Sequence, residues 1–198
     1  MPLPIAGFIR QQLQACLKAG DCVLDGTAGN GHDTLLLAQC VGGRGKVFAF
    51  DVQQTALDNT VERLQAADCA QQVSLIHAGH ERLADYVDTP LAAAVFNFGY
   101  LPGGDKQLTT HADTSIAALQ AAIALLQPGG LLFATLYPGH PAGLVEANTV
   151  EAWAAGLPQQ EVQVLRYQFI NQRNQPPYLL VLEKCPAKTG KERSASCI

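Results

Sequence analysis

Short apolar runs alternate along the chain with longer stretches in which apolar residues recur at helical spacing. The runs are of the kind that forms buried parallel strands, and they span residues 22–24, 46–50, 73–76, 91–96 and 131–136. The helical stretches span residues 13–18 (the end of a short N-terminal helix), 33–40, 55–67, 114–126 and 143–155. Glycine-rich turns separate several of them, including a turn at residues 128–130. Strands that alternate with helices predict a parallel sheet.

Two further apolar runs, residues 161–169 and 178–183, have only a turn between them. Without an intervening helix they should pair as an antiparallel hairpin. The pattern therefore predicts an α/β, Rossmann-like fold: a seven-stranded, mostly parallel sheet with a C-terminal antiparallel hairpin and helices on both faces. This is the layout of the class I methyltransferases.

The composition is that of one compact domain. The chain has 198 residues, of which 48 % are hydrophobic and 15 % charged, as expected for a single α/β domain. We assign this domain to residues 1–184 and expect the polar residues 185–198 to form a disordered tail. The formal net charge is −4 and the pI is about 5.7, well below the pI of a strongly basic nucleic-acid binder.

Cysteine usage and the N-terminal residues indicate a cellular location. None of the six cysteines belongs to a C-x-x-C pair, which favours reduced thiols over disulfides or a zinc site. The chain does not start with a basic segment followed by an apolar one, and no apolar run reaches the roughly 18 residues of a membrane-spanning helix. We therefore expect a cytoplasmic protein without a membrane segment.

A glycine-rich turn, Asp25-Gly26-Thr27-Ala28-Gly29-Asn30-Gly31, follows directly after the first predicted strand. Glycines let the backbone approach a ligand closely, and the crevice of an open α/β sheet lies at the carboxyl ends of its strands. Asp51 ends the second predicted strand about 20 residues later, where a carboxylate can accept hydrogen bonds from both hydroxyls of a ribose. The pattern predicts a site for a nucleoside-containing cofactor.

Two kinds of cofactor are candidates for binding at this turn. A dinucleotide such as NAD requires G-x-G-x-x-G, and Thr34 stands where the third glycine is expected. Asp25 would repel a pyrophosphate, whereas it can pair with the ammonium group of S-adenosylmethionine. These residues favour S-adenosylmethionine; the alternative for Asp25 is that it only caps the turn.

His77 and His80 follow the third predicted strand as an H-x-x-H pair, which can indicate a metal site. A zinc site needs further ligands at suitable spacing, and none is evident, so we expect no metal. His80 and Glu81 are instead expected at the adenine edge of the cofactor pocket or at the cap of the next helix.

The fourth predicted strand leads into Asn97-Phe98-Gly99-Tyr100-Leu101-Pro102, which faces the transferable methyl group in this fold. The segment is similar to the N-P-P-Y motif of methyltransferases that act on amino nitrogens. An asparagine oxygen and a neighbouring backbone carbonyl can accept both N–H bonds of an amine and aim its lone pair at the methyl carbon. We expect Asn97, Gly99 and Tyr100 to be catalytic, with Tyr100 stacking on a base or flanking the reacting group; core packing is the alternative for Tyr100.

An amine attacks only in its uncharged form, so the site must desolvate it or remove its proton. Asp105, His111 and His140 are candidate proton acceptors, and the sequence does not choose among them. Lys106 is a candidate phosphate contact or a solvated surface lysine. Tyr137 ends the fifth predicted strand beside the same crevice.

The turn of the final hairpin, residues 171–177, is rich in amides. Asn171, Arg173 and Asn174 in this turn are candidates for hydrogen bonding to the acceptor, although turns favour asparagine in any case. If the acceptor is RNA, we expect local recognition through the Lys106 loop and the Arg173 turn, because the net charge of the chain is negative.

Several of these segments together resemble one family. They are DGTAGNGHDT at residues 25–34, FDVQ at 50–53, His80-Glu81, NFGYLPGGDK at 97–106, YPGH at 137–140 with Gly143 and Glu146, and NQRNQPP at 171–177. They are similar to the small methyltransferases formerly described as rRNA methylases and now associated with methylation of 5-aminomethyl-2-thiouridine at the tRNA wobble position (MnmM-type). The resemblance runs from about residue 20 to residue 184. Gly26 and Phe98 stand where alanine and leucine are usual, and both keep the site chemistry.

The resemblance implies transfer of a methyl group from S-adenosylmethionine to the primary amine on the wobble uridine, with the tRNA anticodon loop as partner. The residues expected to bind the cofactor are Asp25, Thr27, Gly29, Asn30, Gly31, His32, Asp33, Thr34, Asp51, Gln53, His80, Glu81 and Asn97. Those expected to bind the acceptor are Tyr100, Leu101, Pro102, Lys106, Tyr137, His140, Asn171, Arg173 and Asn174.

Other functions stay open at this point. The enzyme could instead methylate rRNA or a small-molecule amine. A cofactor-binding or RNA-binding protein without catalytic activity is a second alternative, and an NAD-linked oxidoreductase is a third that the missing glycine disfavours. A homodimer is also left open by the sequence.

Overall fold

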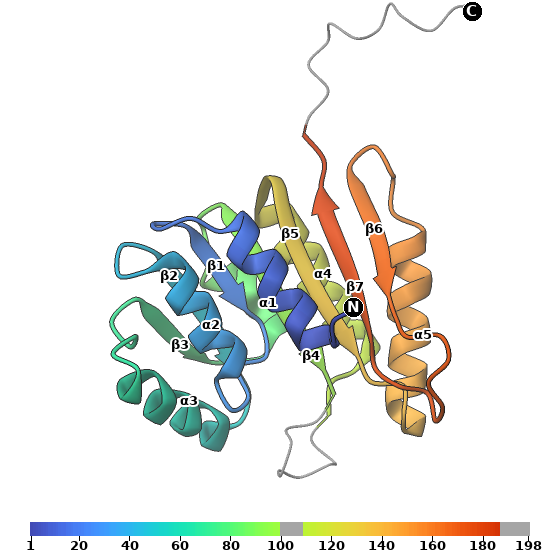
Figure 1. Cartoon of the computed structure of the whole chain (residues 1–198), viewed down its shortest axis with the longest axis horizontal. Coiled ribbons are helices and arrows are strands. Elements are labelled where there is room, and N and C mark those ends of the chain that lie inside the picture. Colours follow the sequence, from blue (N-terminus) through green and yellow to red (C-terminus); the bar gives the residue numbers. More distant parts are fainter. Residues whose placement is uncertain (100–108, 187–198) are drawn as a thin grey trace, which may run out of the picture.

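The computed structural model describes residues 1–99 and 109–186 of the chain. Seven strands form one sheet in the order β3-β2-β1-β4-β5-β7-β6 (Figure 1). The strands are β1 (Cys22–Asp25), β2 (Lys46–Asp51), β3 (Val73–His77), β4 (Leu91–Phe98), β5 (Leu126–Leu136), β6 (Val162–Tyr167) and β7 (Tyr178–Lys184). The first five are parallel, and β7 lies antiparallel between β5 and β6. The predicted parallel sheet with a C-terminal antiparallel hairpin is confirmed.

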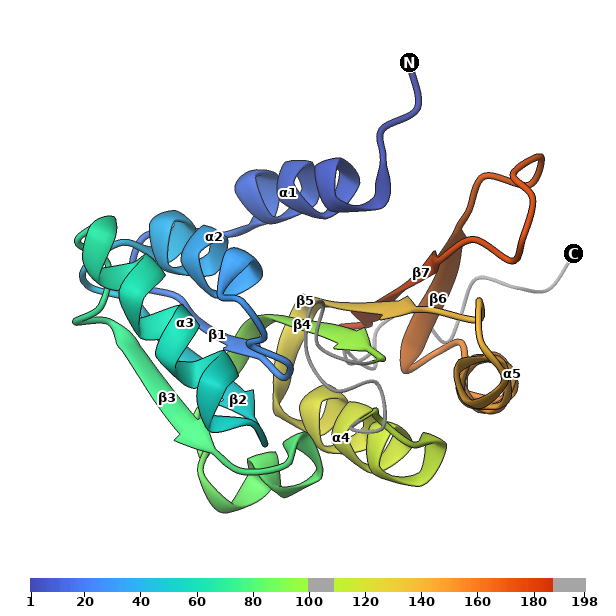
Figure 2. The same ribbon diagram turned by 90° about the horizontal axis from the view of Figure 1, so that it is seen from below.

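Helices cover both faces of this sheet, as predicted (Figure 2). The helices are α1 (Ile5–Cys16), α2 (His32–Val41), α3 (Gln54–Ala66), α4 (Ala112–Leu125) and α5 (Pro141–Ala155), with a 3-10 segment, η1 (His80–Asp85), between β3 and β4. The first three helices lie on one face, and α4 and α5 lie on the other. The result is a three-layer α/β/α domain.

Alternation along the central strands decides which side chains meet which helices. In β4, Val95 is buried in the cluster that contains Ile9 of α1 and Leu37 of α2. Its neighbour Phe96 is buried on the opposite face, in the cluster that contains Leu119 of α4. Successive side chains of a strand point to opposite faces of the sheet. The residue two positions after Val95 therefore points to the same face as Val95, the face covered by α1, at the carboxyl end of the sheet.

Some boundaries differ from those predicted. Helix α1 begins at Ile5 and ends at Cys16, whereas the sequence pattern marked only its end, at residues 13–18. Strand β5 begins at Leu126 and includes the predicted turn at residues 128–130. The pairing of β4 with β5 shifts register after Leu91, and Gly129 has φ +78°, so this turn is an irregularity within the strand.

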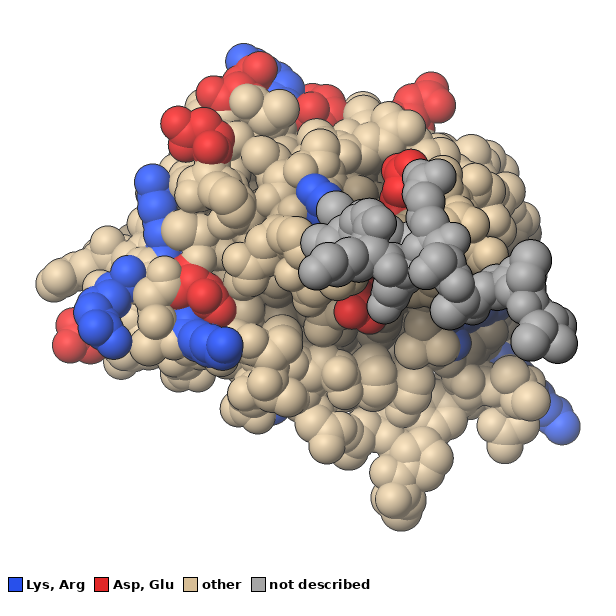
Figure 3. Space-filling view, turned by 90° about the horizontal axis from the view of Figure 1, so that it is seen from above, with Lys and Arg blue, Asp and Glu red and all other residues tan. Residues whose placement is uncertain are grey.

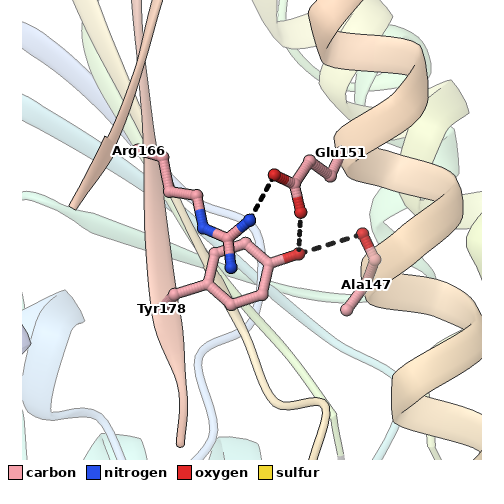
Figure 4. Close-up of polar contacts among 4 residues, drawn as sticks. All are labelled: Ala147, Glu151, Arg166 and Tyr178. Atoms are coloured by element: carbon pink, nitrogen blue, oxygen red, sulfur yellow. Dashed lines mark hydrogen bonds and ion pairs between the residues drawn. The ribbon is translucent and has the colours of Figure 1, made fainter. Parts of the chain in front are cut away.

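Helix α5 is joined to the hairpin by a small polar cluster (Figure 4). The Tyr178 hydroxyl donates to Glu151 Oε2 at 2.9 Å and also contacts the Ala147 carbonyl oxygen at 3.1 Å. Arg166 pairs with Glu151, and its guanidinium lies 4.1 Å from the centre of the Tyr178 ring. Burial and the Glu151 hydrogen bond raise the pKa of Tyr178, which stays protonated and keeps donating at neutral pH. The cluster fixes the start of β7 against α5.

The end of the molecule opposite the carboxyl ends of the parallel strands has scattered charges (Figure 3). Basic side chains there lie beside acidic ones, and most of the visible surface is uncharged. No helix within residues 1–99 and 109–186 is long and apolar enough to cross a membrane. Most of the predicted tail, residues 187–198, lies outside the described residues.

Candidate functional site

The predicted glycine-rich turn connects β1 to α2 at the carboxyl end of the sheet. Gly31 has φ +76°, a left-handed conformation that favours glycine. A Cβ atom added to Gly31 would lie 2.9 Å from Cα of Thr60 in α3. The turn therefore needs glycine here for two reasons, its backbone conformation and its contact with α3.

Asp51, at the end of β2, is hydrogen-bonded to this turn. Its Oδ2 accepts the backbone N–H of Gly29 at 2.9 Å, and its Oδ1 accepts that of Gln53 at 2.9 Å. The turn is also held from α3, where Arg63 Nε donates to the Asn30 carbonyl oxygen at 2.6 Å. The predicted acid and the predicted turn thus form one structural unit, although they lie in separate segments of the sequence.

Asp25 is completely buried at the end of β1. Its Oδ1 accepts the backbone N–H of Thr27 at 3.1 Å, and its Oδ2 accepts the Thr34 hydroxyl at 2.6 Å. Burial, followed by the nearby charge of Asp33, raises the pKa of Asp25 to about 7. Asp25 therefore holds the turn together from inside. Asp33, in the first turn of α2, lies beside the turn and lines a cleft.

The charge of this region suits a cationic ligand. Asp25, Asp33 and Asp51 lie close enough for the charges of Asp33 and Asp51 to raise the pKa of Asp25. Within the described part of the chain the ion pairs are Arg82–Asp85 and Arg166–Glu151, so none of the three carboxylates is paired with a basic residue there. S-adenosylmethionine carries an ammonium and a sulfonium group, so the residues present fit it; they do not fit a pyrophosphate.

Asn97 lies near the end of β4 and faces the same cleft. Its backbone N–H donates to Thr27 Oγ1 at 2.7 Å, and its Nδ2 donates to Asp33 Oδ2 at 2.8 Å. Since an ionised carboxylate can only accept hydrogen bonds, the amide must present its NH2 group to Asp33. Oδ1 therefore points away, with the Tyr137 hydroxyl at 3.4 Å. The carbonyl oxygen of Gly99 accepts the backbone N–H of Thr110 at 3.2 Å.

A cleft of about 270 Å³ opens beside Asn97. One wall is polar and comes from α2 and the ends of β4 and β5; it consists of Asp33, Asn97, Thr135 and Tyr137. The other wall comes from α1 and the β6–β7 turn; it consists of Pro4, Ile5, Ala6, Ile9, Phe169, Gln172 and Pro177. The cleft lies next to the glycine-rich turn, because Asp33 follows that turn in α2 and Asn97 donates its backbone N–H to Thr27 of the turn.

His80 is buried rather than displayed at a pocket edge. The residue is 9 % exposed, and its ring packs edge-to-face with Phe96 and Phe98, with ring centres 6.3 and 5.6 Å away. Burial lowers the pKa of His80, so the ring is neutral. Glu81 is exposed. No group of three or more histidine, cysteine or acidic side chains able to hold a metal occurs among the described residues.

The remaining predicted residues are placed differently. His140 caps the N-terminus of α5, where its Nδ1 accepts the backbone N–H of Gly143 at 3.1 Å, and Tyr137 lines the cleft. His32, the first residue of α2, is exposed, and so are the predicted residues of the β6–β7 turn, Asn171, Arg173 and Asn174. Tyr100, Leu101, Pro102, Asp105 and Lys106 lie outside the described residues.

Two buried polar residues were not predicted as site residues: Thr135, which lines the cleft, and Glu146, which the sequence analysis named only as part of a matching motif. Thr135 is 2 % exposed, and its hydroxyl has no hydrogen-bond partner among the described residues. Glu146 of α5 is 3 % exposed and accepts the hydroxyls of Thr110 at 2.8 Å and Ser115 at 2.6 Å. For both residues, the signal available in the sequence was a polar residue at a position surrounded by apolar ones.

Residues 47–183 match the sequence profile of the family described as "Putative rRNA methylase". The chain belongs to this rRNA methylase family. A relative, the chloroplastic tRNA (mnm(5)s(2)U34)-methyltransferase of Arabidopsis thaliana, is 35 % identical over 178 residues. That match covers 85 % of this chain and 65 % of the relative, so the chain spans less than two thirds of the relative's length.

Similar solved structures show that this member of the rRNA methylase family has the class I methyltransferase fold. A protein of Clostridium thermocellum described as a "putative rRNA-methylase" superposes with a TM-score of 0.91 at 39 % identity, covering 93 % of this chain and 99 % of that one. A "putative methyltransferase" from Streptococcus mutans, solved in complex with SAH, has a TM-score of 0.85 at 34 % identity with the same coverage, 93 % and 99 %. These matches extend the resemblance from single motifs to nearly the whole described domain.

Proposed function

We propose that this chain is an S-adenosylmethionine-dependent N-methyltransferase that converts the 5-aminomethyl group of the tRNA wobble 2-thiouridine to 5-methylaminomethyl. The observation that carries the proposal is the fixed orientation of the Asn97 amide beside the cleft that it lines: its NH2 is bonded to Asp33, and its oxygen faces the Tyr137 hydroxyl at 3.4 Å. An oxygen held there can accept an N–H of an amine. Asp25, Asp33 and Asp51, which lie in or beside the glycine-rich turn, supply negative charge that complements a cationic cofactor.

The cofactor would be held by residues from four elements. Asp51 suits the two ribose hydroxyls, and the glycine-rich turn lets the backbone approach the cofactor closely. The negative charges of Asp25 and Asp33 suit the ammonium group. When bound, S-adenosylmethionine supplies an electrophilic methyl group on a positively charged sulfur.

In the proposed reaction, the amine nitrogen attacks the methyl carbon in line with the carbon–sulfur bond. The new C–N bond forms as that bond breaks, and the sulfur keeps the electron pair as a neutral thioether. Asn97 Oδ1 holds one N–H of the amine, which aims the lone pair at the methyl carbon. The amine must arrive uncharged, and the methylated product releases a proton, so the site needs a route for protons.

The tRNA acceptor is supported by the name of the Arabidopsis relative, a tRNA (mnm(5)s(2)U34)-methyltransferase, because mnm(5)s(2)U34 is the product of the proposed reaction. Anticodon-loop bases splay out readily, so a wobble base can enter a cleft without melting a duplex. The net charge of −4 favours contacts through a few residues, among them the exposed Arg173 of the β6–β7 turn. The second candidate is rRNA, which the description of the matching family favours.

One experiment separates these acceptors. The purified chain is incubated with methyl-labelled S-adenosylmethionine and, in parallel, with tRNA and rRNA from cells that lack this activity. We expect label in tRNA, lost in Asn97→Ala and retained in Asn148→Ala, a change at an exposed asparagine of α5. Label confined to rRNA would establish the second candidate, and no label in either pool would contradict both.

A further inference from the structure

The cleft beside Asn97 has two walls of different chemistry. Asn97 and Thr135 are paired residues of neighbouring strands β4 and β5, so their side chains point to the same face of the sheet. Tyr137 lies two residues beyond Thr135 on that face, and Asp33 completes the polar wall. Ile5 and Ile9 of α1 and Phe169 and Pro177 of the β6–β7 turn also line the cleft and supply apolar surface.

The Thr135 hydroxyl is the unusual group in the polar wall. It is buried, and no hydrogen-bond partner occurs for it among the described residues. Phe133, two residues earlier on the same face, is fully buried in the core beneath α1, so an apolar residue would suit this position in the free protein. A buried hydroxyl without a partner destabilises a protein unless a ligand supplies that partner.

The apolar wall is held in place by contacts between α1 and the hairpin. The Tyr167 hydroxyl donates to the Leu3 carbonyl oxygen at 2.6 Å. The Tyr167 ring stacks on Phe8 with ring centres 4.3 Å apart, and it meets Phe169 edge-on at 6.1 Å. Residues far apart in the sequence therefore form one wall that is held together by contacts within the protein.

We propose that this cleft holds the flat ring of the acceptor base, with Phe169 against a ring face and the Thr135 hydroxyl hydrogen-bonded to a polar atom on the ring edge. A nucleobase has apolar faces and a polar edge, which match the two walls. The ring then lies beside Asn97, and its aminomethyl arm reaches the amide oxygen. This inference rests on the proposed function and adds the residues that select the ring.

The first test replaces the apolar wall. Phe169→Ala should raise the KM for tRNA about tenfold or more, because a stacking surface is lost, while the Kd for S-adenosylhomocysteine changes by less than about twofold. Ile170→Ala is the matched control, since Ile170 is the next residue, is 94 % exposed and does not line the cleft. A KM for tRNA that is unchanged in Phe169→Ala, or raised equally in Ile170→Ala, would overturn the assignment.

The second test removes only the hydroxyl. Thr135→Val keeps the side-chain shape, so it should leave the melting temperature unchanged or higher while raising the KM for tRNA several-fold. A purely structural role for Thr135 predicts the opposite pair of results, a lower melting temperature and an unchanged KM. If the wild-type chain methylates tRNA and both variants retain its KM, this inference fails and the proposed function stands. If the wild-type chain methylates no tRNA, the proposed function fails, and the inference with it.

Discussion

The Asn97 side chain donates from Nδ2 to Asp33 Oδ2 over 2.8 Å, a bond that joins the end of β4 to the first turn of α2. Because the carboxylate can only accept, this bond decides which end of the Asn97 amide faces the cleft. The same two residues line the cleft beside the glycine-rich turn. Asp33 is thus a positioning residue for Asn97.

Replacing Asp33 by Asn should remove that orientational control, because an amide partner can pair with either end of the Asn97 side chain. We expect the single-turnover rate constant for methyl transfer to fall by about tenfold or more, the scale of a lost charge-assisted hydrogen bond of about 1.5–3 kcal/mol. The measurement is single-turnover methyl transfer at saturating cofactor and tRNA. Asp113→Asn, at an exposed residue in the first turn of α4, is the control, and equal rates for the two variants would contradict the positioning role.

Asp51→Ala should weaken cofactor binding by about 1–3 kcal/mol, since it removes a carboxylate that also bonds the Gly29 amide. Isothermal titration with S-adenosylhomocysteine measures the change. Asp85→Ala is a suitable comparison, because Asp85 is an exposed carboxylate paired with Arg82. An unaltered Kd in Asp51→Ala would remove Asp51 from the cofactor site.

We expect Asp25 to make cofactor binding depend on pH. Its folded-state pKa is raised to about 7, so the folded chain holds this proton more tightly than the unfolded chain does, and this contribution to stability is lost as the pH rises through about 7. A bound ammonium group favours the ionised form, so binding should release a proton. We expect the Kd for S-adenosylhomocysteine to tighten by about tenfold from about pH 6 to pH 8.

Asp25→Asn is the control for that pH dependence, because it keeps the shape of the side chain and cannot ionise. Its Kd should be nearly constant over the same pH range, and the binding heat should no longer depend on the ionisation enthalpy of the buffer. A wild-type Kd without any trend would show that Asp25 does not respond to the cofactor. A trend that persists in Asp25→Asn would assign the titration to another group.

Gly31→Ala tests why the turn requires glycine. Both Gly31 and Gly129 have positive φ, +76° and +78°, but only a Cβ at Gly31 would meet the backbone of Thr60. Gly129→Ala should therefore lower the free energy of unfolding by about 1–2 kcal/mol, from conformation alone. Gly31→Ala should lower it by about 1–3 kcal/mol more, because α3 must move. Denaturant unfolding compares them, and equal losses would mean that the contact with α3 is unimportant.

The sequence pattern predicted the fold well because buried parallel strands such as β2 and β4 are continuous apolar runs with turns at both ends. It found only the end of α1, because no helix-start signal marks Ile5 and the first turn of α1 carries no acidic residue. The irregularity at Gly129 depends on the register between β4 and β5, which local sequence does not encode.

The sequence predicted those site residues that belong to recognisable motifs. Asp51, Asp33 and Asn97 were chosen from motif and strand-end positions, and the structure brings them together around the turn. The burial of Asp25 and the wall that Phe169 forms depend on contacts between distant segments. No local pattern reports such contacts, so neither could be predicted.

The most direct test of the proposed function is the identity of the methylated nucleoside. Transfer RNA that carries 5-aminomethyl-2-thiouridine is incubated with the chain and S-adenosylmethionine, digested to nucleosides, and analysed by mass spectrometry. We predict that the 5-aminomethyl nucleoside disappears as 5-methylaminomethyl-2-thiouridine appears, and that Asn97→Ala prevents this while still binding S-adenosylhomocysteine. An unchanged wobble nucleoside, from a wild-type chain that binds S-adenosylhomocysteine, would contradict the proposed reaction.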